Sequence, residues 1–111
     1  MLNQATLVGR LTSDLEVKET ENGVQVANMT IAVQRSYKNE NGEYDTDFID
    51  CVLWNSIAAN TSLYCKKGDM VGVRGRIQTG NYVDYDGNKR KVTEIIAEKI
   101  TFLSSKKANS E

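Results

Sequence analysis

The chain of 111 residues contains no histidine and no proline. Histidine is the usual general base of Ser-His-Asp and Cys-His sites and the commonest zinc ligand, so its absence excludes those catalytic sites. Proline makes up about 5% of an average chain, so its absence argues against a proline-rich linker or tail. The length suits one domain with a single hydrophobic core.

Cysteine is scarce and long apolar runs are missing. Cys51 and Cys65 have apolar neighbours and form no CxxC pair, which predicts two buried, reduced thiols and no metal site. The N-terminus lacks the features of a secretory signal, and no apolar run approaches the roughly 20 residues of a membrane-spanning helix. We therefore expect a cytoplasmic protein without a membrane partner, a metal ion or a cofactor.

Alternating apolar and polar residues predict an all-β chain. Such runs cover residues 7–11, 14–19, 24–35, 47–54, 70–78 and 92–103, and five principal strands are expected among them. Turn signals stand at Asn22-Gly23, at Asn41-Gly42 within a polar loop of residues 37–46, and near Asp86-Gly87-Asn88. Val71, Val73, Gly75 and Ile77 are expected to face inward from the fourth strand.

One short helix is expected between the third and fourth strands. Asn55 or Ser56 is a candidate N-cap, Lys66 and Lys67 suit the negative end of the helix dipole, and Gly68 suits the position after the C-cap. Five strands with a helix in this gap favour an OB (oligonucleotide/oligosaccharide-binding) barrel with extended hairpins over residues 1–103. Residues 104–111 are expected to be a short, disordered polar tail.

Two aromatic residues are predicted to point outward from the third strand. Phe48 and Trp54 lie six residues apart, so they share a face with Asp50 while the opposite face is apolar. Outward rings stack on nucleic-acid bases, or they pack against a loop or a second subunit; the pattern favours neither. Tyr64 and Phe102 are expected in the core.

The net charge of -1 hides a segregated distribution. Residues 66–91 hold seven basic and three acidic side chains, a local charge of +4, whereas residues 1–65 carry a charge of -5. Arg74 and Arg76 share strand parity with Tyr82, so one surface combines a ring with two cations, as a groove for single strands needs. The run Lys89-Arg90-Lys91 also fits a solvated turn.

Three carboxylates present the best case for an enzyme. Asp45, Asp47 and Asp50 are close in sequence, and carboxylates bind divalent ions. Asp45 and Asp47 have the opposite strand parity to Asp50, and no metal-loop motif joins them. We expect no catalytic residues and no metal site, and keep a metal-dependent nuclease as a third hypothesis.

Several ordered blocks resemble bacterial single-stranded DNA-binding proteins (SSB). The blocks are Leu7–Thr12 with Asp14 and Glu16, Asn22-Gly23, Val26–Asn28, Ile31–Val33, Asp47–Trp54, Lys67-Gly68, Val71–Gly75 and Thr93-Glu94. The resemblance covers about residues 1–103. It implies an OB fold, usually a homotetramer with a dimer as the alternative, located with the nucleoid, that protects single-stranded DNA in replication, recombination and repair.

The resemblance also implies particular binding residues. Base stacking is expected at Tyr37, Phe48, Trp54 and Tyr82. Phosphate contacts are expected at Arg35, Lys38, Lys67, Arg76, Lys89, Arg90 and Lys91, and the strand pattern adds Arg74. Gly80 and Asn81 stand where relatives often carry a cation.

Many relatives have a long tail with an acidic tip that recruits replication and repair enzymes. This chain stops at Glu111, so recruitment through such a tip is not expected. An alternative to an SSB is a primosome-type interaction module of the same fold, with weak affinity for single-stranded DNA and its Phe48/Trp54 face buried against a partner.

Overall fold

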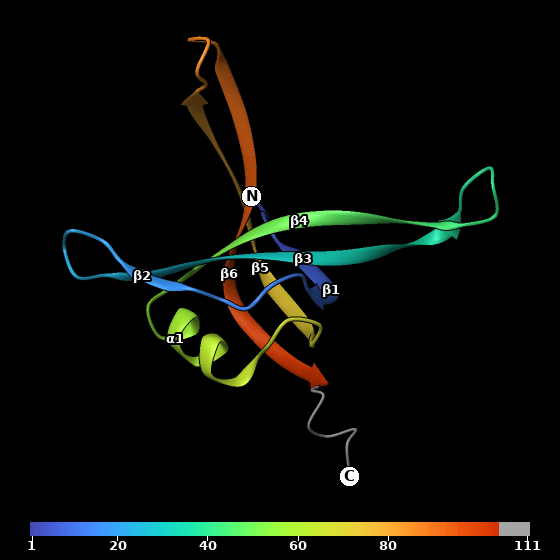
Figure 1. Cartoon of the computed structure of the whole chain (residues 1–111), viewed down its shortest axis with the longest axis horizontal. Helices are drawn as coiled ribbons and strands as arrows, with labels where there is room; N and C mark the ends of the chain where they lie inside the picture. Colours follow the sequence, from blue (N-terminus) through green and yellow to red (C-terminus); the bar gives the residue numbers. More distant parts are fainter. Residues whose placement is uncertain (105–111) are drawn as a thin grey trace.

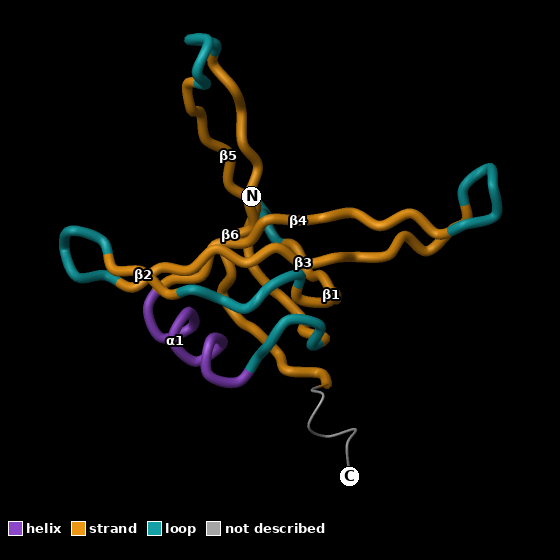
Figure 2. Tube along the Cα trace, viewed as in Figure 1, coloured by secondary structure: helices purple, strands orange, loops and turns teal. Residues whose placement is uncertain are grey.

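The chain forms six strands and one helix within residues 1–104, the residues that this computed structural model describes. The strands are β1 (Ala5–Leu11), β2 (Val17–Glu19), β3 (Gln25–Lys38), β4 (Tyr44–Trp54), β5 (Met70–Val83) and β6 (Lys89–Ser104), and the helix is α1 (Asn55–Tyr64). Their order is β1-β5-β6-β4-β3-β2, and β1 also pairs with β3, which closes a five-stranded barrel (Figure 1, Figure 2). The predicted OB-fold barrel is confirmed.

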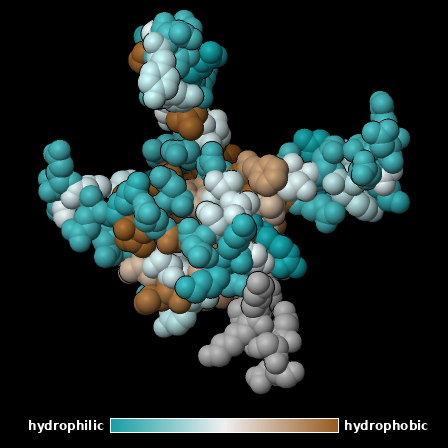
Figure 3. Space-filling view, viewed as in Figure 1, coloured by the Kyte–Doolittle hydropathy of each residue, from teal (hydrophilic) through white to brown (hydrophobic). Residues whose placement is uncertain are grey.

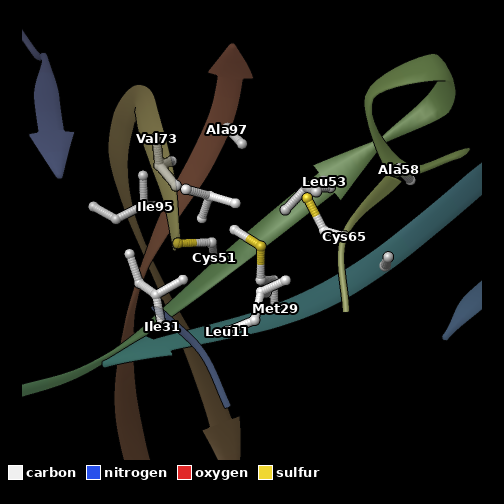
Figure 4. Packing of buried hydrophobic residues seen from close by; sticks show 12 residues of the cluster. Leu11, Met29, Ile31, Cys51, Leu53, Ala58, Cys65, Val73, Ile95 and Ala97 are labelled. Atoms are coloured by element: carbon white, nitrogen blue, oxygen red, sulfur yellow. The ribbon is translucent and has the colours of Figure 1, made fainter. Parts of the chain in front are cut away.

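The core is built from the strand faces that alternation marked as apolar. Met29, Ile31, Cys51 and Leu53 are at most 2% exposed and meet side chains from β5, β6 and α1 (Figure 4). Both cysteines are free and buried, as predicted. Burial, with a smaller contribution from Asp50, raises the pKa of Cys51 to about 12, so this thiol stays protonated at neutral pH.

The two long hairpins, β3–β4 and β5–β6, turn through loops with the same hydrogen-bonding pattern. Asn39 opens one loop and Asp84 the other, and the side-chain oxygen of each accepts hydrogen bonds from the backbone N–H groups two and four residues later. The glycine three residues after each has a φ near +80°, 79° at Gly42 and 82° at Gly87, which favours glycine. These turns confirm the two hairpin predictions.

The hairpin arms are longer than the sequence pattern indicated. Residues 37–46 were expected to form a polar loop, but β3 continues to Lys38 and β4 begins at Tyr44. Each arm supplies the backbone hydrogen bonds of the other, so neither needs an apolar face to remain a strand. The β2–β3, β3–β4 and β5–β6 hairpins leave the barrel in different directions (Figure 1). Their surfaces are mostly hydrophilic (Figure 3).

These projecting arms enlarge the molecule. The radius of gyration is 15.7 Å, against about 13 Å for a compact domain of this length. No helix in the described part of the chain is both long enough and apolar enough to span a bilayer.

Both expected ends of the helix are corrected. Trp54, not Asn55 or Ser56, occupies the N-cap position, and no side chain caps the helix there. Asn55 has a φ of 56° because the chain turns directly from β4 into α1. Cys65 ends the helix, so Lys66 and Lys67 lie beyond the last turn. Packing of Ala58 and Thr61 against the barrel therefore stabilises a helix without strong caps.

Three residues expected in the core lie at the surface. Ile77 is 45% exposed because it lies two residues beyond the last β1–β5 pair, where β5 leaves the barrel. Tyr64 and Phe102 are 65% and 46% exposed. Their rings contact each other, with centroids 5.8 Å apart, where the last residue of α1 meets the C-terminal part of β6.

Candidate nucleic-acid interface

The outer face of β4 displays two aromatic rings. Phe48 is 68% exposed and Trp54 is 39% exposed, so the predicted outward direction is confirmed. Six residues of strand separate them by about 20 Å, because a strand rises about 3.3 Å per residue. Between them Asp50 accepts a hydrogen bond from the Thr30 hydroxyl at 2.7 Å. One base is too small to contact both rings.

Strand pairing joins this face of β4 to the β5–β6 hairpin. Val52 of β4 lies beside Ile96 of β6 in the parallel β4–β6 pair, and Ile96 lies opposite Arg76 of β5. On the other side, Val52 lies opposite Asn28 of β3. Cross-strand neighbours share a face, so the outer face of the sheet runs from Arg76 to Asn28, with Val52 and Ile96 between them only 7% exposed. We call it the outer surface.

The other two predicted stacking residues lie on the hairpin arms. Tyr82, 54% exposed, has the strand parity of Arg76 and lies opposite Arg90. Tyr37, 66% exposed, lies on the β3 arm within the irregularity between Gln34 and Lys38. All four predicted stacking rings are therefore exposed, and three have strand positions on the outer surface or its extension along the β5–β6 arm.

Arg35 is held by carboxylates. Its guanidinium donates to both oxygens of Asp47, from Nε at 3.1 and 3.3 Å and from Nη2 at 2.9 Å, and Asp45 lies 3.8 Å from Nη1. The hydrogen bond with Asp47 raises the pKa of Arg35 and lowers that of Asp47. A phosphate that contacts Arg35 would have to share it with these two carboxylates.

Two further arginines are also paired. Arg76 lies 3.5 Å from Glu98, and Arg90 donates from Nε to Asp84 at 2.9 Å. That bond, with the backbone N–H groups of Asn88 and Asp86, lowers the pKa of Asp84. These pairs could not be predicted from the sequence, because cross-strand partners depend on register.

The remaining predicted cations are distributed over several surfaces. Lys89 and Lys91 flank Arg90 on β6 and so point to the other face of the hairpin. Lys67 lies in the α1–β5 loop, at the opposite end of β5 from the hairpin. The structure therefore does not bring all eight predicted cations together.

The acidic residues do not form a metal cluster. Among residues 1–104 no group of three or more potential ligands is close enough to hold an ion. Asp45 and Asp47 face Arg35, and Asp50 faces Thr30. The nuclease hypothesis therefore lacks a site in the described part of the chain.

Comparison with known proteins identifies the family. The model described as the single-strand binding protein family matches residues 2–103. The chain belongs to the single-strand binding protein family. It is 50% identical to "Single-stranded DNA-binding protein 2" of Listeria monocytogenes, of which it covers 69%. It is 48% identical over 106 residues to "Single-stranded DNA-binding protein B" of Bacillus subtilis, of which it covers 94%.

A further member of the family shows the same likeness. The "Single-stranded DNA-binding protein" of Halalkalibacterium halodurans is 49% identical over the whole chain, which spans 66% of that relative's length. The names of these relatives are those of DNA-binding proteins. The resemblance drawn from the sequence blocks is confirmed, and the residue roles it implied remain predictions.

Proposed function

We propose that this family member binds single-stranded DNA without strong sequence preference, in replication, recombination and repair. The observation that carries the proposal is the outer surface, where Phe48 and Trp54 are exposed on β4 and strand pairing connects them to Arg76. Every base presents a flat face, so stacking on exposed rings tolerates any sequence. The names of the relatives support the same ligand.

In this mechanism the rings bind separate bases along the strand. Phe48 and Trp54 stack bases on β4, and Tyr37 and Tyr82 stack others on the two arms. Each stacked base contributes about 1–3 kcal/mol. No catalytic step is proposed, since Asp50 on this surface is hydrogen-bonded to Thr30 and Asp47, on the opposite face of β4, is paired with Arg35.

The cations provide the part of the affinity that depends on salt. The logarithm of affinity for a single strand falls with the logarithm of salt concentration by about 0.7 for each phosphate contact. Three of the eight candidates, Arg35, Arg76 and Arg90, are paired with carboxylates. Contacts from all eight would give a slope of about -5.6, and each cation that its position or its carboxylate partner keeps away from phosphate makes the slope shallower by about 0.7.

The protein is also proposed to associate with itself, as a homotetramer or a dimer. Val8 of β1 lies opposite Gly72 of β5, and Leu103 of β6 lies near the same glycine. Val8 and Leu103 are 51% and 48% exposed, which leaves an apolar face on β1, β5 and β6 that suits a second copy. Light scattering with and without oligonucleotide measures the number of subunits.

Titration with oligo-dT at several salt concentrations tests the proposal, with Trp54 fluorescence as the signal. We expect quenching on binding and a negative slope no steeper than about -5.6. Phe48→Ala and Trp54→Ala should each lose about 1–3 kcal/mol, the latter followed by anisotropy of a labelled oligonucleotide. Tyr64→Ala, at an exposed ring away from the outer surface, is the matched control. Weak binding that no ring substitution changes would favour the interaction module.

A further inference from the structure

We infer that Asn3 is a positioning residue for the β5–β6 hairpin. Its Nδ2 donates to the carbonyl oxygen of Ile77 at 2.8 Å, and the Ile77 N–H donates to its Oδ1 at 2.9 Å. One side-chain amide thus satisfies both backbone groups of a residue 74 positions away. The inference rests on the proposed function, because the hairpin carries Tyr82.

This pair of hydrogen bonds lies where β5 leaves the barrel. The β1–β5 ladder ends at the pair Ala5 and Gly75, and Ile77 is two residues further along β5. The side chain of Asn3 therefore takes the place of one more residue of β1, since it offers the donor and the acceptor that a strand neighbour would offer. The N-terminus is drawn at the base of this hairpin (Figure 1).

Beyond this level the hairpin has no other strand partner in the described residues. The pairing of β6 with β4 is confined to Ile95 and Ile96, and Ile95 lies opposite Ile77. Further out, β5 and β6 pair only with each other. Asn3 and the β4–β6 pair thus hold the base of the hairpin from its two sides.

The base is also where the ladder is irregular. The β5–β6 register shifts between Arg74 and Gly75, and such a bulge bends the strand and interrupts its hydrogen bonds. A hairpin attached through this bend needs a second attachment to hold one direction. Asn3 binds Ile77, which lies between Arg76 and Gln78 at the start of the exposed β5–β6 arm. It therefore fixes the direction of this arm and, through it, the position of Tyr82 further along β5.

A double-mutant cycle in oligo-dT binding tests the inference. Residues that act through one another are not additive, whereas independent residues are. We expect Asn3→Ala to weaken binding about threefold or more in the native background and less than about twofold in a Tyr82→Ala background. Equal losses in both backgrounds would show that Asn3 does not act through Tyr82. Gln4→Ala, at the neighbouring exposed amide, should leave affinity unchanged.

Spin-label distances provide a readout that does not depend on DNA. Labels on Glu40→Cys and Tyr85→Cys, at the tips of the two long hairpins, react selectively because Cys51 and Cys65 are buried. Asn3→Ala should broaden the tip-to-tip distance distribution, and Asn3→Asp, which keeps the acceptor but loses the donor, should broaden it less. An unchanged distribution would overturn the inference. Failure of the native protein to bind oligo-dT would instead overturn the proposed function.

Discussion

Replacing Gly75 by alanine should damage the barrel severely, for a reason visible in the backbone. A Cβ added at Gly75 would lie 2.1 Å from the carbonyl oxygen of Ile96 and 3.1 Å from the Cα of Ala97. These atoms belong to the paired strand β6, so no side-chain rotation relieves the overlap and the ladder itself must move. Overpacking costs about 1–3 kcal/mol, occasionally more, and we expect about 3 kcal/mol here.

Gly80 offers a matched control on the same strand. A Cβ there would lie 3.5 Å from a side-chain carbon of Val92, an ordinary contact, and Gly80 does not have a positive φ. Gly80→Ala should therefore be neutral or stabilise the protein slightly, by up to about 1 kcal/mol. Chemical denaturation at one protein concentration gives both values. Free energies of unfolding within about 0.5 kcal/mol of each other would refute the reasoning from backbone contact.

Three other outcomes follow from the turns and the thiols. Gly87→Ala, at a φ of 82° in open surroundings, should cost about 1 kcal/mol in unfolding free energy from backbone strain alone. The pKa of Asp84 is lowered chiefly by Arg90, so the ionised carboxylate stabilises its turn above the ordinary pKa of 3.8 and this stabilisation should vanish as pH falls through the lowered value. Amide exchange in the hairpin measures the loss, and Asp84→Asn should abolish the pH dependence. Cys51, with a pKa of about 12, should react with thiol reagents only when the protein unfolds, and rapid labelling of the native protein would contradict its burial.

The inward and outward faces of β3 and β4 could be predicted from the sequence because these strands keep a period of two. Met29 and Ile31 alternate with polar neighbours, and Phe48 and Trp54 fall on the face opposite Cys51. Period alone decides these directions. The position of the helix between β4 and β5 then made the barrel recognisable.

The failures share a physical cause, which is that burial and pairing depend on distant segments. Tyr64 and Phe102 have apolar character, but whether another element covers them is a property of the whole fold. The partners of Arg35 depend on the β3–β4 register, and its irregularity at Gln34 was not visible in the sequence. The contact between Asn3 and Ile77 extends the β1–β5 ladder between residues 74 positions apart in the sequence, and no local pattern marks it.

Photocrosslinking of oligo-dT, with the attached residues identified by mass spectrometry, tests the proposed interface most directly. Tyr64 and Phe102 are internal controls, because they are exposed rings that lie away from the outer surface. The proposal predicts crosslinks at Phe48, Trp54 and Tyr82 and none at the two control rings. Crosslinks at Tyr64 and Phe102 with none at Phe48 or Trp54 would contradict it.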